Sequence, residues 1–173
     1  MKCPCCSNKK FNECCGKIIQ SKNAQSPEQL MRSRFSAYAT KNAKYIYNSY
    51  AEKTRCNLTL DDLQKEMNNC IWTKLVINSC SPFEKNKPTL DLKKAPTVSF
   101  SAYYILNNQL VKMSETSRFI YSDKWYYLDG DNIEHNELGR IKSNDICPCF
   151  GNSLAGGLVN TKKAKKFKHC CAR

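Results

Sequence analysis

Cysteine is the residue type whose number and spacing in this sequence point to chemistry. The chain contains 12 Cys among 173 residues, and nine of them lie in two short stretches, at residues 3–15 and 147–171. Each stretch reads Cys-Pro-Cys, then a spacer, then Lys-Lys-Phe-x-x-Cys-Cys. Two pairs of thiolates close a tetrahedral zinc site with Zn–S bonds of about 2.3 Å and leave no position open for water. The repeat therefore predicts two small metal-binding knuckles with a structural rather than a catalytic role.

The same cysteines would suit a disulfide scaffold if the protein were secreted. The first residues, Met1-Lys2-Cys3-Pro4-Cys5-Cys6, carry no apolar segment of an export signal. We therefore expect a cytoplasmic protein, in which clustered cysteines are metal ligands more often than disulfides. Zinc suits an all-thiolate tetrahedral site best, and iron is the alternative metal. The isolated Cys56, Cys70 and Cys80 are expected to be small buried hydrophobic residues.

Both stretches resemble the SEC-C motif, C-P-C followed by K-[FY]-x-x-C-[CH], a metal-binding tail known from the SecA preprotein translocase. Three features depart from that motif. Cys6 stands where Gly is usual, His169 comes one place too early to be a ligand, and the second spacer carries an insertion around residues 154–157. The resemblance implies one zinc ion per knuckle, two per chain, held by eight ligands: Cys3, Cys5, Cys14, Cys15, Cys147, Cys149, Cys170 and Cys171.

Positive charge is concentrated in the same two end segments. The formal net charge of the chain is +13. Residues 1–25 contain five Lys against one Glu, and residues 141–173 contain seven basic residues against one Asp, whereas residues 26–140 are nearly balanced. This pattern indicates a globular body with a small basic module at each end.

The central segment has the pattern of helices followed by strands. Ser26-Pro27-Glu28-Gln29 predicts a helix start with a capping box, and further helices are expected over residues 43–50 and from Thr59. From residue 71 the apolar period becomes two, which predicts strands near 71–77, 98–106, 110–121 and 124–128, with a turn at Asn107-Asn108 and a loop over 82–94. Helices followed by an antiparallel meander give an α+β fold.

The whole arrangement resembles the YchJ family of bacterial proteins. The residues that carry this resemblance are 27–38, 115–119 and 125–130, together with both knuckles. It implies a nuclear-transport-factor-2-like middle domain, a cone of helices on a curved antiparallel sheet, between two SEC-C knuckles. The expected boundaries are 1–22, 26–140 and 144–173.

Two charged residues fall on faces that are otherwise apolar. Arg34 lies within the stripe of the first long helix, and Glu115 shares a strand face with Val111, Met113 and Phe119. Because a buried charge needs a partner, we expect Arg34 and Glu115 to approach each other in the interior or to line a pocket. A structural ion pair is the preferred interpretation, and a ligand pocket is the alternative.

The sequence carries no convincing catalytic set. It contains two His, of which His135 is expected in an exposed polar loop, and no phosphate-binding loop, nucleophile elbow or dinucleotide fingerprint. No apolar run approaches the roughly 18 residues of a membrane span. We therefore expect a non-enzymatic zinc protein.

Partner binding is expected at the basic knuckles. SEC-C tails dock on a chaperone and on the ribosome, which implies an adaptor that contacts a protein or ribosomal partner. RNA binding is the alternative, with the two Phe as stacking residues, and ligand binding or catalysis in the middle-domain pocket is a third possibility. A further interpretation is that the lysines only keep a cysteine-rich segment soluble. The residues expected to make these contacts are Lys9, Lys10, Phe11, Lys165, Lys166, Phe167 and Lys168.

Overall fold

Side-chain caps fix where the main helices begin. The structure, a computed structural model, describes residues 1–84, 87–89, 91–148 and 165–172. Ser26 Oγ accepts the Gln29 amide at 3.1 Å, and Pro27 opens α2 (Pro27–Ala39). Asn42 caps α3 (Ala43–Ser49) and Thr59 caps α5 (Leu60–Asn69) in the same way. These helix starts are confirmed.

The predicted capping box at Ser26 differs in one detail. The side chain of Gln29 accepts a hydrogen bond from the backbone amide of Gln25 at 3.0 Å, and Gln25 is the residue before the cap.

Two short helices were not predicted, α1 (Cys15–Ser21) and α4 (Glu52–Arg55). The described residues also include three 3-10 turns: η1 (Phe11–Glu13), η2 (Leu92–Lys94) and η6 (Phe167–His169).

Four antiparallel strands form one sheet in chain order, β1 (Cys70–Cys80), β2 (Thr97–Leu106), β3 (Gln109–Tyr121) and β4 (Trp125–Arg140). Asn107 and Asn108 join β2 to β3 with φ angles of 51° and 62°. Positive φ at both loop residues is the requirement of a tight hairpin turn, and Asn tolerates it better than most residues. The predicted meander and the α+β class are confirmed.

Strand β4 is much longer than the sequence pattern indicated. It was predicted to end near residue 128, but it pairs with β3 as far as Arg140. Residues 131–140 are all exposed and mostly polar, and their two large apolar residues, Ile133 and Leu138, do not give the alternation that marks a strand in sequence. His135 therefore lies on a strand rather than in a loop, and its Nδ1 is 3.0 Å from Tyr104 Oη.

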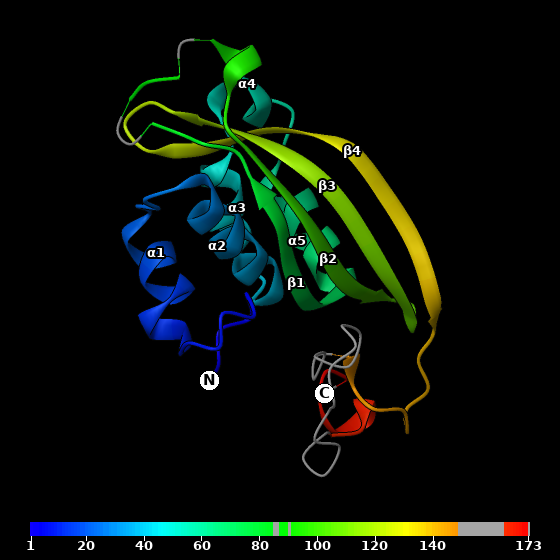
Figure 1. Cartoon of the computed structure of the whole chain (residues 1–173). Coiled ribbons are helices and arrows are strands. Elements are labelled where there is room, and N and C mark those ends of the chain that lie inside the picture. The colour runs from blue at the N-terminus through cyan, green and yellow to red at the C-terminus, as the bar shows by residue number, and fades with distance from the viewer. Residues whose placement is uncertain (85–86, 90, 149–164, 173) are drawn as a thin grey trace.

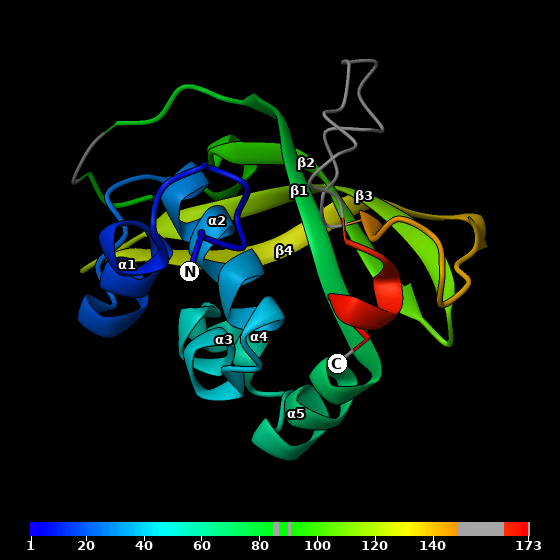
Figure 2. The ribbon, with the colours of Figure 1, turned by 90° about the horizontal axis from the view of Figure 1, so that it is seen from below.

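The helices cover one face of the curved sheet (Figures 1 and 2). Between these layers lies the core, in which Phe35 of α2, Phe100 of β2 and Phe119 of β3 are fully buried. Among the described residues, no helix is long and apolar enough to cross a membrane.

The prediction that the isolated cysteines are buried is wrong for Cys56 and Cys80, which are exposed. Cys70 is only partly buried.

Candidate metal centres

The first cysteine cluster assembles four sulfurs at the N-terminal end. The Sγ atoms of Cys3, Cys5, Cys14 and Cys15 all lie within 4.8 Å of one another. Cys5 Sγ and Cys14 Sγ are 3.7 Å apart, and Cys14 Sγ and Cys15 Sγ are 3.9 Å apart. Zn–S bonds of about 2.3 Å in a tetrahedron require S–S edges of about 3.8 Å. The four residues expected as ligands therefore fit a tetrahedral metal ion.

Backbone hydrogen bonds shape this knuckle. Lys2 and Lys10 form an antiparallel bridge, and the amide of Cys3 donates to the carbonyl of Lys9 at 2.8 Å. The η1 turn then brings the second cysteine pair back, with the amide of Cys14 donating to the carbonyl of Phe11 at 3.1 Å. Gly16 is needed here because a Cβ at that position would lie 2.8 Å from the Phe11 carbonyl oxygen.

The C-terminal end repeats this construction. Ile146 and Lys166 form the antiparallel bridge, and the amide of Cys147 donates to the carbonyl of Lys165 at 2.9 Å. The amide of Cys170 donates to the carbonyl of Phe167 at 3.0 Å, as Cys14 does to Phe11. The internal repeat of the sequence is therefore a repeat of the backbone fold.

Three sulfurs of the second cluster are brought together. The Sγ atoms of Cys147, Cys170 and Cys171 lie within 4.8 Å of one another. Cys149, the fourth expected ligand, and residues 154–157 of the insertion lie outside the described residues. His169 is not part of the cluster, in agreement with its omission from the expected ligands.

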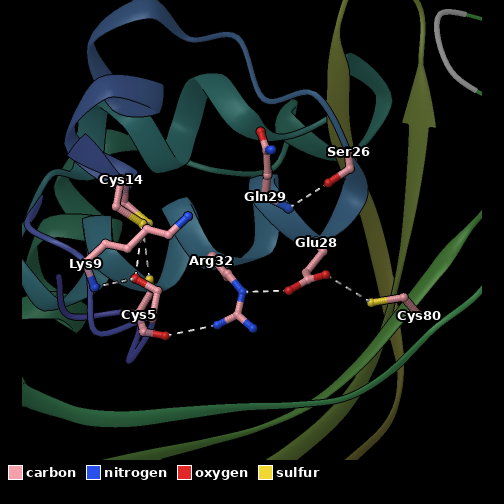
Figure 3. A network of polar contacts seen from close by, with 10 residues as sticks. Cys5, Lys9, Cys14, Ser26, Glu28, Gln29, Arg32 and Cys80 are labelled. Atoms are coloured by element: carbon pink, nitrogen blue, oxygen red, sulfur yellow. Dashed lines mark hydrogen bonds and ion pairs between the residues drawn. The ribbon is translucent and has the colours of Figure 1, made fainter. Parts of the chain in front are cut away.

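Helix α2 holds the N-terminal knuckle against the middle domain. Arg32 Nη1 donates to the carbonyl of Cys5 at 3.1 Å, while Arg32 Nε pairs with Glu28 Oε1 at 2.7 Å (Figure 3). Ser36 Oγ lies 3.6 Å from the sulfur of Cys3. Hydroxyl and backbone contacts of this kind orient metal ligands and tune their basicity. Sequence analysis missed Arg32 and Ser36, because only the packing of the knuckle on α2 brings them to the cluster.

Hydrogen bonds between the sulfurs of this cluster shift the pKa values of Cys3 and Cys15 in opposite directions. Hydrogen bonds from the thiols of Cys15 and Cys5 lower the pKa of Cys3. The hydrogen bond that Cys15 gives to Cys3, together with burial, raises the pKa of Cys15. Four thiolates this close together repel one another, so a metal ion is needed to hold them.

The lysines and phenylalanines expected as partner contacts divide into two groups. Lys9, Lys10, Lys165, Lys166 and Lys168 are exposed. Phe11 is half-buried, and Phe167 is only 4% exposed, packed in a cluster with Ile105 and Leu110 of the sheet. The expectation that both rings are exposed for stacking or anchoring is therefore wrong for Phe167. In both copies the ring packs against its own protein.

Arg34 and Glu115 line one cavity of about 150 Å³. Arg34 is 4% exposed and Glu115 is 9% exposed. No ion pair joins these two described residues, so the expected direct pair is not formed. Instead the ring of Tyr127 lies 4.1 Å from the Arg34 guanidinium, and its hydroxyl donates to Glu115 Oε1 at 3.0 Å. Tyr127 therefore links the two charges, and nothing in the sequence pattern marks this residue for that role.

Comparison with known proteins places the chain in a family. The model of the YchJ middle NTF2-like domain matches residues 26–130, more than half of the chain. The chain belongs to the YchJ family. UPF0225 proteins of Shewanella sp. strains MR-4 and ANA-3 are each 33% identical to it over 99% of this chain and 96% of theirs. The NTF2-like cone expected from the sequence is therefore confirmed.

Solved structures similar to this YchJ-family protein carry the SEC-C motif. The solution structure of a SEC-C motif containing protein from Rhodopseudomonas palustris is 27% identical, covers 78% of this chain and all of its own, and has a TM-score of 0.65. A crystal structure of such a protein from Psychrobacter arcticus shares the fold at 22% identity and a TM-score of 0.63, over 99% of this chain and 96% of its own. The cysteine clusters of this family member are thus suited to a metal ion.

Proposed function

We propose that this protein is a non-enzymatic cytosolic adaptor with two structural zinc ions, whose basic knuckles dock on an acidic protein or ribosomal partner. The observation that carries this proposal is the duplicated knuckle. The same backbone turn occurs at both ends, and each copy directs its Phe inward and leaves its lysines exposed. A turn whose backbone is held by hydrogen bonds presents its lysines at fixed positions to a partner. Such an arrangement can bind a partner without any catalytic residue.

The geometry of the sulfurs supports zinc. Four thiolates with S–S separations of 3.7 and 3.9 Å match a closed tetrahedral ion, and closure leaves no position for a substrate. For the second ion we assign Cys149 as the fourth ligand, by the repeat of the sequence. Iron is the competing occupant of an all-thiolate site.

The exposed lysines support an acidic partner. All five lysines expected as partner contacts are exposed, and of these Lys10 is in an exposed ion pair with Glu13 at 3.4 Å, a contact of small energetic value. Such charges steer association and fix orientation more than they add affinity. RNA is the second candidate, because lysines also neutralise phosphates. The buried Phe167 weighs against RNA, since it is not available for base stacking.

Metal content tests the first half of the proposal. Untagged protein purified without air is analysed by elemental mass spectrometry. Two zinc ions per chain are expected, falling to one in Cys3→Ser/Cys5→Ser and in Cys170→Ser/Cys171→Ser. Iron in place of zinc, or one ion per wild-type chain, contradicts it.

Docking is tested by co-sedimentation of the zinc-loaded protein with purified ribosomes. The variants Lys9→Ala/Lys10→Ala and Lys165→Ala/Lys166→Ala/Lys168→Ala should each weaken binding, whereas the exposed middle-domain variant Lys41→Ala/Lys65→Ala should not. Complete competition by polyuridylic acid, with a steep loss of binding as salt rises, identifies RNA as the partner instead. Equal binding by all variants rules out docking through the knuckles.

A further inference from the structure

A cavity of the middle domain carries charged side chains that the protein itself pairs only in part. It lies between α2, α5 and the sheet, and its volume is about 150 Å³. An engineered protein cavity of about that volume binds benzene, so the space fits a ligand of about six non-hydrogen atoms. The apolar part of the wall is formed by Met31, Phe35, Phe100, Ala102 and Met113. These side chains suit a small aliphatic group of a ligand.

The guanidinium of Arg34 is the positive group of this cavity. The side chain lines the cavity and is only 4% exposed. Its Nη1 donates to Ser49 Oγ, and the hydroxyl of Tyr50 lies close enough to accept a second N–H. Three of the five N–H groups of a guanidinium then have no acceptor among the described residues. A carboxylate is the group that matches adjacent guanidinium N–H groups, through two parallel hydrogen bonds.

The aromatic rings beside this guanidinium do not enclose it. The ring centroids of Tyr50 and Tyr127 lie 4.4 and 4.1 Å from Arg34 Cζ, and they are 5.0 Å from each other. Rings so close together cover adjacent sides of the group rather than opposite sides. These cation–π contacts offset part of the cost of burying the charge without neutralising it. No ion pair joins Arg34 to a described residue, so a ligand carboxylate would supply the missing negative charge.

The carboxyl group of Glu115 is a negative group of the same wall. Ser117 Oγ and Tyr127 Oη both donate to its Oε1, at 2.6 and 3.0 Å, and no described residue donates to Oε2. Among the described side chains, the polar atom that is sealed from water without a partner is Trp72 Nε1, so Glu115 Oε2 is open to the cavity. The carboxyl group is therefore held in place with one oxygen left to receive a donor.

A second carboxylate lies at the mouth of the cavity. Glu66 of α5 is part of the wall and is exposed. The wall thus carries two carboxylates against one guanidinium, which favours a ligand with a cationic group. An ammonium has three donors, enough to contact Glu66 and Glu115 together. Because water screens the exposed Glu66, the closed part of the cavity holds one charge of each sign, those of Arg34 and Glu115.

The positive and negative groups in the closed part of the wall are close together. The ring of Tyr127 lies 4.1 Å from the Arg34 guanidinium, and its hydroxyl donates to Glu115. A ligand that pairs with both groups therefore carries its carboxylate and its ammonium only a few atoms apart. An α-amino acid has this arrangement, with a single carbon between the two groups.

We propose that this cavity binds a small α-amino acid, with its carboxylate on Arg34, its ammonium on Glu115 Oε2 and Glu66, and its side chain against the apolar wall. None of the residues that line the cavity belongs to either cysteine cluster. Amino-acid binding and metal binding are therefore separate properties of the molecule.

The probe that tests this site is L-alanine, which has six non-hydrogen atoms. Carbon-13 NMR spectra of the zinc-loaded protein, labelled at the methionine methyl groups, report the cavity directly. Met31 and Met113 line it, whereas Met1 and Met67 do not and are the internal references. We expect the first two signals to shift with a dissociation constant of about 1 mM, within the limit for so small a ligand. Met31→Leu and Met113→Leu assign the signals.

Two further probes each lack one of the charged groups. Propionate has no ammonium and ethylamine has no carboxylate, so each should bind at least about tenfold more weakly than L-alanine. Equal affinity for ethylamine would make the cavity a simple cation site, and equal affinity for propionate would make it an anion site. Either result overturns the proposal, as does the absence of any shift of Met31 and Met113 at the solubility limit of L-alanine.

Substitution of the carboxylates tests the assigned contacts. Glu66→Gln alters an exposed residue and should weaken L-alanine binding about threefold, and Glu115→Gln should weaken it about tenfold. The matched control is Glu134→Gln, at an exposed position of β4 outside the cavity wall, which should leave the affinity unchanged. Wild-type affinity in both cavity variants contradicts the proposal. Should Glu115→Gln unfold, Glu66→Gln and the two probes on wild-type protein give the decision.

Discussion

Arg32 joins the N-terminal metal cluster to the middle domain, because its guanidinium donates to the main-chain carbonyl of Cys5 at 3.1 Å from within α2. The same guanidinium is fixed by Glu28 at 2.7 Å, one turn earlier on the helix (Figure 3). The knuckle is therefore not an independent appendage. Cys3, Cys5 and Cys15 lie in the same buried cluster as Leu30 and Phe35 of α2.

Replacing Arg32 should loosen the knuckle. Arg32→Met removes the donor to Cys5 and the ion pair with Glu28, so we expect zinc release to a chelator to become faster and the free energy of unfolding to fall by about 1 kcal/mol. Arg118→Met is the matched control, because Arg118 makes a similarly exposed pair with Asp129 on β3 and β4. It should leave the rate of zinc release unchanged. Equal release rates in both variants would show that Arg32 does not anchor the site.

Removal of the metal should destabilise more than the knuckle. Since the cluster sulfurs pack into the core beside α2, chelation should lower the free energy of unfolding of the middle domain by about 3 kcal/mol or more. Urea unfolding followed by tryptophan fluorescence measures this, because Trp72 contacts Phe35 of α2. The variant Cys170→Ser/Cys171→Ser keeps only the first cluster and should respond to the chelator in the same direction. Superimposable curves with and without chelator contradict the coupling.

Cys6 occupies a backbone position that favours glycine. Its φ is 62°, and its sulfur lies outside the four-sulfur cluster. Left-handed backbone costs a residue with a Cβ about 1–2 kcal/mol, and the greater chain entropy of Gly offsets part of that. We expect Cys6→Gly to raise stability by about 0.5 kcal/mol with no loss of zinc. Asn8→Gly, also at φ 62°, should gain less because Asn tolerates this region. Loss of one zinc ion in Cys6→Gly would instead make Cys6 a ligand.

Gly130 leaves room for the side chain of Glu115. A Cβ at residue 130 would lie 2.6 Å from Glu115 Cδ, so Gly130→Ala must displace the carboxyl group. Overpacking of this kind costs about 1–3 kcal/mol. Because Glu115→Ala removes the group that the new Cβ would meet, Gly130→Ala should cost less stability in the Glu115→Ala background than in the wild type, as a double-mutant cycle from urea unfolding measures. Strict additivity of the two losses argues against the contact.

Tyr127 should make the fold sensitive to alkaline pH. Burial, together with the neighbouring Glu115, raises the pKa of its hydroxyl well above the usual value near 10. Above about pH 10 the unfolded chain loses this proton while the folded chain keeps it, so stability is present below that pH and falls as pH rises, by at most about 1.4 kcal/mol per pH unit for this group.

The matched variant is Tyr127→Phe, in which the slope of stability between pH 9 and 11 should be shallower than in the wild type, whatever its absolute stability. Tyr121→Phe, on the neighbouring strand, is the control for general effects of removing a hydroxyl. Parallel slopes in wild type and Tyr127→Phe would exclude a shifted Tyr127.

The sequence by itself determined the elements that depend on local chemistry. Ser26 and Thr59 start helices because their oxygens accept amides three residues ahead, and Asn107-Asn108 turns because Asn tolerates positive φ. The paired Cys-Pro-Cys and Cys-Cys segments specified the metal-type clusters, because the cysteines of each pair are adjacent or nearly adjacent in sequence, which keeps their thiols close together whatever surrounds them.

Only the tertiary structure decided the relationships between distant segments. The burial of Phe167 depends on Ile105 and Leu110, and the length of β4 depends on pairing with β3 rather than on its own polar residues. The charges of Arg34 and Glu115 marked the interior in sequence, but the placement of Tyr127 between them follows from the packing of α2 on the sheet. The spacing of apolar residues in the sequence predicts which face of a helix or strand is buried. Only the packing of the elements determines which residues that buried face contacts.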